Sequence, residues 1–533
     1  MELKKVGGEF LIFAEKERRL MQNFEMVAKT QQGLEEILAE ELRNLGASEV
    51  EPGLRMVSFK GDLETLYRAN FCCRTALRIL KPFYKFFASS PEELYERAKE
   101  YDWSEILGPD KSFSVDTVAY SEEISHSRYA TYRVKDAISD WFRDRYGDKR
   151  PRVSTIDPDI IINLHISGTR VTLSLDSSGE SLHKRGYRVA QTEAPINEVL
   201  AAGIILRSGW RGETPFIDPM CGSGTFLIEA ALIAANINPG IFRNHFAFEK
   251  WKDFNPEIFD SIYNDDSHEC EITVPIIGAD ISPKAIAVAE KNIRNARLHK
   301  NIELKVMALS QWESAPADGV LITNPPYGER LNPEHLDELY ALLGQKLKQV
   351  FVGYHAWVIG YRDEHFAKIG LAPSQKIPLL NGSLECKLRE YIIFEGTKSN
   401  FRKSGGNLKD HVAPRQERPF RRQTDKEWER DARKSGFSRK ENGPSRQGNK
   451  FGYPTPGERF RRAFEEKEAE TSRSRRFKPK SQYPFKKDKK ETENTRWTKP
   501  SLPPQEGPMM RERKAGWKKR PEWLNPMNEE NND

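Results

Sequence analysis

Hydrophobic and polar positions in the first part of the chain follow an order of short strands and amphipathic helices. Residues 24–30 alternate in the manner of a strand, and residues 32–45 carry apolar side chains at helical spacing. The pattern then predicts, in order, a hairpin over 50–60 turning at Pro52-Gly53, a helix over 62–69 and a strand over 75–86. This order is typical of a small α+β layer of the ferredoxin-like type.

A second unit is predicted to begin at Ser90 with a capped helix. Its further elements are a strand over 112–119, a long helix over 127–146 and strands over 160–166 and 170–174 around a Ser-Gly-Thr turn. His126 and His165 stand alone, and no constellation typical of catalysis is visible. A binding role is therefore the better interpretation of this unit.

From Pro195 onward helices alternate with apolar strands, which is the signature of a doubly wound, mostly parallel sheet. The expected fold class is α/β, Rossmann-like, preceded by the α+β units. The predicted helices are 197–208, 224–235, 283–296 and 335–350, and the predicted strands are 215–218, 274–280, 302–306, 319–323 and 355–359, with a closing hairpin over 378–395.

A glycine-rich turn joins the first of these strands to its helix. Glycines in such a turn let the backbone approach a ligand, and free N–H groups at the helix start attract an anionic group. The turn lacks the Lys-Ser/Thr of a triphosphate loop, so ATP is disfavoured, and Cys221 is interpreted as a small filler and not as a nucleophile. The candidate ligand-binding residues here are Asp218, Pro219, Cys221, Gly222, Ser223, Gly224 and Thr225.

Asp280 ends the second strand, where a carboxylate beside a glycine-rich turn is placed to hold ribose hydroxyls. The alternative is a charge at a helix N-terminus. The segment 236–271, with its many aromatic residues, is interpreted as an insertion over the site.

The fourth strand ends in Asn324-Pro325-Pro326-Tyr327. Two prolines fix two φ angles and remove two backbone donors, so carbonyl oxygens stay free to accept hydrogen bonds. The Asn324 side chain and a neighbouring carbonyl can receive N–H bonds from an exocyclic amino group, and Tyr327 offers a face on which a base can stack. A proline-stiffened turn with a packed tyrosine is the alternative.

Charge is distributed unevenly along the 533 residues. Residues 397–533 hold 37 Lys+Arg against 21 Asp+Glu, a net of +16, whereas residues 1–396 hold 48 against 58, a net of −10. The tail has no apolar periodicity and is expected to be disordered. Its mixed cations and aromatics favour RNA binding, and a solubilising polyampholyte is the alternative.

Five cysteines form neither a CxxC pair nor a cluster with zinc spacing, so no metal and no disulfide framework is expected, and a reducing cytoplasm is the natural setting. No signal peptide or membrane span is expected, and residues 1–23 are interpreted as an unstructured leader. The connector Lys184-Arg185-Gly186-Tyr187-Arg188 is either a solvated joint or a phosphate path.

Together the glycine-rich turn, Asp280 and the Asn-Pro-Pro-Tyr loop resemble a class I S-adenosylmethionine-dependent methyltransferase that modifies an exocyclic amino group. The amino-acid sequence at residues 218–225, 183–188 and 324–330 is similar to that of THUMP-containing ribosomal RNA guanine-N2 methyltransferases that act on the bacterial large subunit. The resemblance implies S-adenosylmethionine as cofactor, 23S ribosomal RNA or a large-subunit assembly intermediate as partner, and RNA binding by residues 90–176 and by Lys184, Arg185 and Arg188.

One position departs from the pattern of these enzymes. Where an acidic residue often follows the third strand, this chain has Met307-Ala308-Leu309, so adenine recognition is expected from backbone groups near Ala308 and Leu309. Alternatives to the guanine activity are methylation of guanine N2 in tRNA or of adenine N6, and a non-catalytic RNA-binding role in ribosome assembly.

The hydrophobic patterns and the resemblance together predict the domain organisation. It consists of a leader (1–23), a ferredoxin-like domain (24–89), a THUMP domain (90–182), a basic connector (183–192), a methyltransferase domain (193–396) and a basic tail (397–533).

Overall fold

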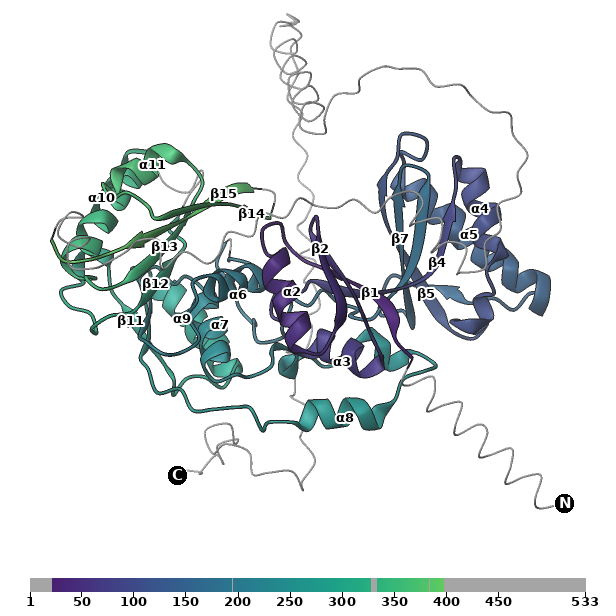
Figure 1. Ribbon diagram of the computed structural model, residues 1–533, viewed down its shortest axis with the longest axis horizontal. Helices are drawn as coiled ribbons and strands as arrows, with labels where there is room; N and C mark the ends of the chain where they lie inside the picture. Colours follow the sequence, from purple (N-terminus) through teal and green to yellow (C-terminus); the bar gives the residue numbers. More distant parts are fainter. Residues whose placement is uncertain (1–21, 194, 327–332, 383, 397–533) are drawn as a thin grey trace, which may run out of the picture. The chain divides into compact units, whose positions relative to one another are not determined.

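The computed structural model of the chain describes residues 22–193, 195–326, 333–382 and 384–396. These residues belong to one compact unit and form two sheets, of eight and seven strands (Figure 1). The leader and the tail expected from the sequence lie outside the described residues, apart from the leader's last two positions. None of the described helices is long and apolar enough to cross a membrane.

The first sheet begins with the α+β layer that the sequence predicts. Its elements are β1 (Phe24–Lys29), α2 (Glu35–Asn44), β2 (Ser48–Gly53), β3 (Met56–Gly61), α3 (Leu63–Cys72) and β4 (Arg78–Phe87). The carboxylate of Asp62 caps α3 by accepting from the N–H of Thr65 at 2.9 Å. The hairpin turns at Leu54-Arg55 and not at Pro52-Gly53, because Gly53 still pairs with Met56 across the strands.

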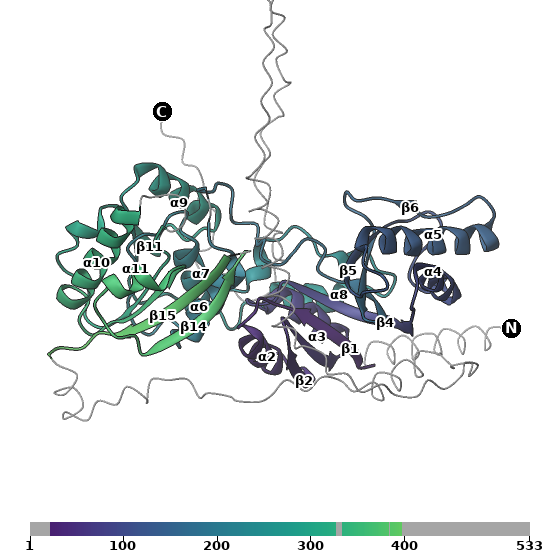
Figure 2. The same cartoon turned by 90° about the horizontal axis from the view of Figure 1, so that it is seen from above.

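The second unit continues the same sheet. Its elements are α4 (Pro91–Glu100), β5 (Ser112–Tyr120), α5 (Ser127–Tyr146), β6 (Arg152–Val153), β7 (Ile160–Ser167) and β8 (Arg170–Asp176). Strand β8 pairs antiparallel with β4, which gives the order β2-β3-β1-β4-β8-β7-β5-β6. Because β4 is shared, the two predicted α+β units form one continuous sheet, a pairing that their separate hydrophobic patterns do not reveal. Helix α5 lies beside β5 and α4 packs against α5, as the view from above shows (Figure 2).

The second sheet has the order β11-β10-β9-β12-β13-β15-β14. The first five of these strands are parallel, and β14 and β15 add an antiparallel hairpin. The strands are β9 (Phe216–Asp218), β10 (Ile276–Asp280), β11 (Ile302–Val306), β12 (Val320–Thr323), β13 (His355–Gly360), β14 (Gln375–Asn381) and β15 (Leu384–Ile392). This topology confirms the predicted doubly wound class.

Two hydrophobic clusters cover the two faces of this sheet. Phe216 and Ile322 face helices α6 (Glu198–Arg207), α7 (Thr225–Ala234) and α9 (Pro283–Asn295). The alternate residues Ile217 and Leu321 belong to the cluster of α10 (Pro333–Gln349) and α11 (Asp363–Lys368). Alternate side chains along each strand are therefore buried in different clusters. Both faces of the strands are apolar for this reason, and the strands are continuous apolar runs in the sequence.

The aromatic insertion 236–271 does not cover the predicted site, so this interpretation is wrong. Its helix α8 (Pro256–Asn264) lies against α3, and Tyr67 of α3 stacks on Phe248 with ring centroids 4.5 Å apart. The hydroxyl of Tyr67 also accepts from the N–H of Asn255 at 3.0 Å. The aromatic residues are therefore a seam between the methyltransferase half and the ferredoxin-like layer.

Candidate active site

The carboxyl ends of β10, β9 and β12 meet at one edge of the second sheet. Asp218 at the end of β9 pairs with Gly278 of β10, and β12 pairs with β9 on the other side. The strand order reverses here, since the chain moves outward from β9 to β10 and β11 and then returns to β12. Open α/β sheets bind ligands at such a switch point. The structure thus brings the glycine-rich turn, Asp280 and Asn324 to the same edge.

The glycine-rich turn is held against the end of β10. The N–H of Cys221 donates to the Ala279 carbonyl at 2.8 Å, and the N–H of Gly222 donates to Oδ2 of Asp280 at 3.0 Å. Gly222 has φ +54°, and a Cβ there would meet nothing nearer than the Thr192 hydroxyl at 3.9 Å. The backbone is therefore bare on its outer side, where a ligand can approach it.

The remaining residues of the turn lie behind that surface. Gly224, at φ +78°, is the N-cap of α7, and Ser223 and Thr225 are buried beneath it. Pro219 is buried directly after Asp218. Burial raises the pKa of the Cys221 thiol well above its ordinary value, which argues against a nucleophilic thiolate.

Asp280 is oriented by two backbone donors. Oδ2 accepts from Gly222, and Oδ1 accepts from the N–H of Ser282 at 2.9 Å. Each oxygen keeps a lone pair, so the carboxylate can still accept two ribose hydroxyls.

Two exposed apolar residues lie beside Asp280, and the sequence pattern did not predict them as ligand-binding residues. Ile281 is 74% exposed directly after β10, and Val306 is 57% exposed at the end of β11. Both lie at the carboxyl edge where a nucleoside base would follow its ribose. Their signal in the sequence is an apolar residue at the end of a strand where a polar one would be expected.

The segment after β11 has fewer free backbone hydrogen-bonding groups than expected. The N–H of Ala308 donates to Oε1 of Gln311 at 2.8 Å, and the Leu309 side chain is buried in the core of the sheet. The donor of Ala308 is thus occupied, and the predicted adenine contacts at Ala308 and Leu309 stay a prediction.

Asp218 is the most buried acid at this edge, with 1% of its surface exposed. Its Oδ1 accepts from the N–H of Met220 at 3.2 Å. Burial raises the pKa of Asp218 to about 7, and the Asp280 carboxylate adds to the rise. The ionisation of Asp218 is therefore sensitive to a positive charge arriving at the site.

Asn324 follows β12 with a buried side-chain oxygen. Among the described residues, no donor lies within hydrogen-bond distance of its Oδ1. Pro325 is buried and Pro326 is half-buried, whereas Tyr327 lies outside the described residues. An unsatisfied buried acceptor is costly, so this oxygen is suited to receive a ligand's N–H.

The structure corrects the predicted RNA contacts in the connector. Arg185 is 2% exposed and donates to the carbonyls of Leu182 and Arg74, close to the Glu229 carboxylate. Arg188 is also largely buried. Both guanidinium groups are engaged inside the protein, so neither is available to a phosphate, and only Lys184 is exposed, beside Glu180.

Arg188 instead holds the glycine-rich turn from behind. It donates to Oε1 of Glu198 at 2.7 Å, to the hydroxyl of Ser223 at 3.0 Å and to that of Thr225 at 2.9 Å. Asn292 of α9 completes the clamp, since it accepts from the N–H groups of residues 189 and 190 and donates to the Ser223 carbonyl at 3.1 Å. The sequence pattern could not distinguish this clamp from a phosphate path.

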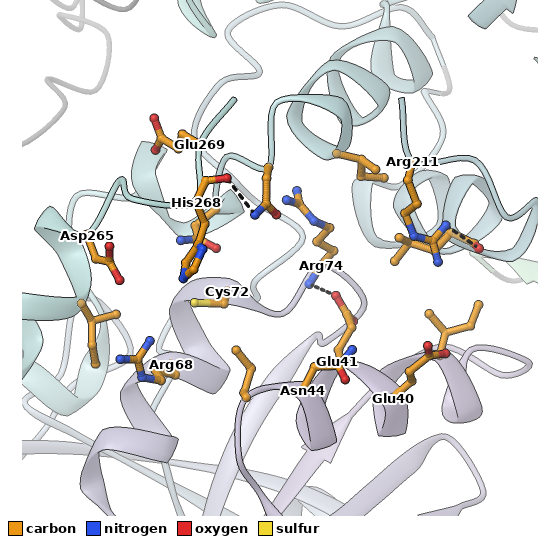
Figure 3. Close-up of a pocket in the computed structure, with 17 residues that line it drawn as sticks. Glu40, Glu41, Asn44, Arg68, Cys72, Arg74, Arg211, Asp265, His268 and Glu269 are labelled. Atoms are coloured by element: carbon orange, nitrogen blue, oxygen red, sulfur yellow. Dashed lines mark hydrogen bonds between the residues drawn. The ribbon is translucent and has the colours of Figure 1, made fainter. Parts of the chain in front are cut away.

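A cavity of about 430 Å³ lies elsewhere, between α2, α3 and the ends of α6 and α7 (Figure 3). Its walls carry both signs of charge, including Glu41, Arg68 and Arg211. Arg74 is bonded to the carbonyls of Leu232 and Ile237. None of the strand-end residues lines this cavity, so we place the active site at the sheet edge, where the chemistry-bearing groups converge. No group of His, Cys, Asp and Glu that could hold a metal occurs within the described part of the chain.

The residues at the sheet edge fit an adenosyl cofactor. The oriented carboxylate of Asp280 matches a ribose diol, exposed Ile281 matches the face of a base, and the bare backbone at Gly222 leaves room for the amino-acid end. This fold and this arrangement of strand-end groups define the class I methyltransferases.

Comparison with known protein families agrees. Residues 25–80 match the RlmL ferredoxin-like domain, residues 88–176 match the THUMP domain, and residues 185–390 match the RMKL-like methyltransferase domain. A protein of Synechocystis whose name is "Putative RNA methyltransferase" is 38% identical, with 69% of this chain and 96% of the relative covered. The chain belongs to this family of RMKL-like methyltransferases, and S-adenosylmethionine is the cofactor of its methyltransferase domain.

Other relatives are longer or structurally characterised. The ribosomal RNA large subunit methyltransferase K/L of Syntrophotalea carbinolica is 41% identical over 382 residues, which are 69% of this chain and 53% of the relative, so the chain spans about half of that protein's length. A crystal structure described as that of "a putative methyltransferase complexed with SAH" has a TM-score of 0.64 at 33% identity, with 70% of this chain and 100% of that chain covered. The predicted family, fold class and cofactor are confirmed, while the exact domain bounds and site residues stay predictions.

Replacing Arg188 tests whether this side chain holds the glycine-rich turn in place. We expect Arg188→Lys to keep a positive charge beside Glu198 but to lose the bonds to Ser223 and Thr225. The turn should then be less ordered, and S-adenosylmethionine should bind about tenfold more weakly, which corresponds to roughly 1.4 kcal/mol of binding free energy. RNA affinity should not change. Calorimetry with the cofactor and filter binding with RNA measure the two effects.

Lys184→Ala is the matched control, because this exposed cation has a 58% exposed side chain beside Glu180. It should leave cofactor affinity at the wild-type value. Loss of RNA affinity in Arg188→Lys with unchanged cofactor affinity would restore the phosphate-path interpretation.

The raised pKa of Asp218 predicts proton release when the cofactor binds. Below pH about 7 the free protein holds this carboxyl protonated. The positive sulfonium favours the ionised form, so binding should release protons near pH 6 to 7 and cofactor affinity should rise with pH until about 7 and then level off. Calorimetry in buffers of different ionisation enthalpy measures the released protons, and Asp218→Asn should abolish the release. An equal release from Asp218→Asn would assign the titration to another group.

Proposed function

We propose that this protein transfers a methyl group from S-adenosylmethionine to the exocyclic N2 of a guanosine in 23S ribosomal RNA of the large subunit. The observation that carries the proposal is the buried, unsatisfied Oδ1 of Asn324, which lies beside the strand ends that bear Asp218 and Asp280. This oxygen is an acceptor for an amino group, and it is adjacent to the methyl donor's site.

The side chains of the loop prepare the amino group for attack. The lone pair of a guanine N2 is delocalised into the ring, which makes the nitrogen a poor nucleophile. Hydrogen bonds from that amino group to the Asn324 oxygen and the Pro325 carbonyl favour a tetrahedral nitrogen with a localised lone pair. The bound cofactor supplies an electrophilic methyl group, so positioning by these rigid acceptors provides the catalysis.

The target base must leave its stack before Asn324 can reach it. Tyr327, which follows the two prolines, is proposed to stack on the extruded base. RNA as the substrate is supported by the match of residues 88–176 to the THUMP domain and by the names of the relatives, which include ribosomal RNA large subunit methyltransferases. Ribosomal RNA is thus the favoured partner, either naked or in an assembly intermediate.

Methylation of adenine N6 is the second candidate, because the same acceptors suit the adenine amino group. It is favoured by one structural neighbour, from Listeria monocytogenes, which is described as a predicted N6-adenine-specific DNA methylase and has a TM-score of 0.64 at 31% identity, with 70% of this chain and 97% of that chain covered. A THUMP domain beside the catalytic domain supports RNA over DNA.

Truncating Asn324 separates catalysis from cofactor binding. We expect Asn324→Ala to lower the methylation rate on the order of 100-fold or more at saturating cofactor, since it removes a preorganised polar contact to the transition state. Its affinity for S-adenosylmethionine should stay near the wild-type value. Asp280→Ala is the comparison variant, in which cofactor binding should weaken first. A wild-type rate for Asn324→Ala would remove the amino-group role from this residue.

The identity of the product decides between the two bases. Ribosomal RNA methylated by the purified protein should yield N2-methylguanosine after digestion to nucleosides and mass spectrometry. N6-methyladenosine as the sole new nucleoside would contradict the guanine assignment. A protein that binds RNA but produces neither nucleoside would instead match the non-catalytic assembly role.

A further inference from the structure

The carboxyl edge of the methyltransferase sheet displays exposed apolar residues on both sides of Asn324. Five large apolar side chains are exposed among the described residues of 195–396, and four of them lie at this edge: Ile281 after β10, Val306 at the end of β11, Tyr361 after β13 and Leu384 at the hairpin of β14 and β15. Ile281 and Val306 stand on the cofactor side. Tyr361, 39% exposed, is the single aromatic residue of the set and stands on the opposite side.

The strand register places Tyr361 just beyond Asn324. Strands β12 and β13 are parallel, with Thr323 opposite Val358. Asn324 is one residue past this level and Tyr361 is three residues past it, so the tyrosine lies on the next strand and about 7 Å further out, at roughly 3.3 Å per residue.

The chain before Tyr361 passes close to two buried rings. A Cβ at Gly360 would lie 2.7 Å from a ring carbon of Phe366 and 2.9 Å from the hydroxyl of Tyr340, so no larger residue fits between them. Phe366 and Tyr340 are both buried, with 1% exposure. The chain therefore passes over a packed support before Tyr361, whose side chain is exposed.

Arg362 is exposed next to this tyrosine, with its guanidinium carbon 5.8 Å from the ring centroid of Tyr361. The acid that follows, Asp363, is engaged by Lys387 and Arg389 of β15. The local negative charge is thus already balanced, and no carboxylate within salt-bridge distance of Arg362 is found in the described ranges. An aromatic ring and an adjacent cation without an acidic partner are the groups that hold single-stranded nucleic acid, through base stacking and phosphate contact.

We propose that Tyr361 and Arg362 form a subsite for the nucleotide next to the target guanosine. Tyr361 stacks on the neighbouring base, and Arg362 contacts the phosphate that links the two nucleotides. The subsite rests on the proposed function, because it takes the target base to be held at Asn324. It binds a single-stranded segment of RNA, and its contacts are stacking and charge rather than base-edge recognition.

The test compares ring-deleting and ring-keeping variants of the full-length protein. Affinity for a short single-stranded RNA with one guanosine between uridines is measured by fluorescence anisotropy, with S-adenosylhomocysteine present at saturation. Tyr361→Ala should weaken RNA binding about tenfold, and Tyr361→Phe should stay within about twofold of wild type, because stacking needs the ring and not the hydroxyl. Calorimetry should give both variants the wild-type affinity for S-adenosylmethionine.

The arginine is tested by salt dependence. Arg362→Ala should weaken RNA binding and reduce the slope of log affinity against log salt by about 0.7, the value for one phosphate on a single strand. Lys348→Ala is the matched control, since this exposed lysine lies near the C-terminal end of α10, which leads back to the amino end of β13. It should change neither affinity nor slope.

Each outcome bears on one claim. Wild-type RNA affinity in Tyr361→Ala, or equal losses in Tyr361→Ala and Tyr361→Phe, would overturn the stacking role, and an unchanged slope in Arg362→Ala would overturn the phosphate contact. Because binding is measured without turnover, these results stand whichever methylated nucleoside the wild type produces. The identity of that nucleoside judges the proposed function separately.

Discussion

The guanidinium of Arg188 makes the contact on which the arrangement of the glycine-rich turn depends. Its bonds to Glu198, Ser223 and Thr225 join the connector, α6 and the glycine-rich turn at one buried point. The side chains of Arg188 and Glu198 are only 15% and 6% exposed. Removing either partner would leave a buried charge unpaired, which typically costs about 3–5 kcal/mol. The glycine-rich turn, which is predicted to contact the cofactor, is thus held in place by charges on its far side.

A second buried network begins three residues earlier in the connector. Arg185 bonds to the carbonyl of Arg74 in the ferredoxin-like layer, and the hydroxyl of Tyr187 donates to Glu229 of α7 at 2.9 Å. Burial raises the pKa of Glu229, and the nearby Arg185 charge opposes that rise. The connector is therefore bonded at Arg185 to the loop between α3 and β4, and at Arg188 to α6 and the glycine-rich turn. We interpret it as the joint that keeps the catalytic half in register with the rest of the unit.

The sequence predicted the elements that have a strong period or a clear boundary signal. The strand ends at Asp218, Asp280 and Thr323 follow from apolar runs stopped by glycine or proline, and their meeting at one edge follows from the parallel topology. The shared sheet through β4 and β8 could not be predicted, because strand alternation reports which face is buried and not which strand is the neighbour. The packing of the aromatic insertion against α3 could not be predicted for the same reason, because an apolar segment does not indicate which surface it packs against.

The basic connector shows that the sequence alone does not indicate whether a charged side chain is exposed or buried. A solvated arginine and a buried arginine that bonds to carbonyls look alike in a chain, and only the structure separates Lys184 from Arg185 and Arg188. The exposed pair at Tyr361 and Arg362 is the converse case, because it carries no motif and becomes visible only beside Asn324. The proposed subsite at the sheet edge thus consists of residues that the sequence pattern did not single out.

The most direct test of the account maps modified nucleosides in ribosomal RNA from cells that lack this protein. One N2-methylguanosine should disappear from the large-subunit RNA, the wild-type gene should restore it, and a gene carrying Asn324→Ala should not. An unchanged set of N2-methylguanosines in the deleted strain, or full restoration by Asn324→Ala, would contradict it.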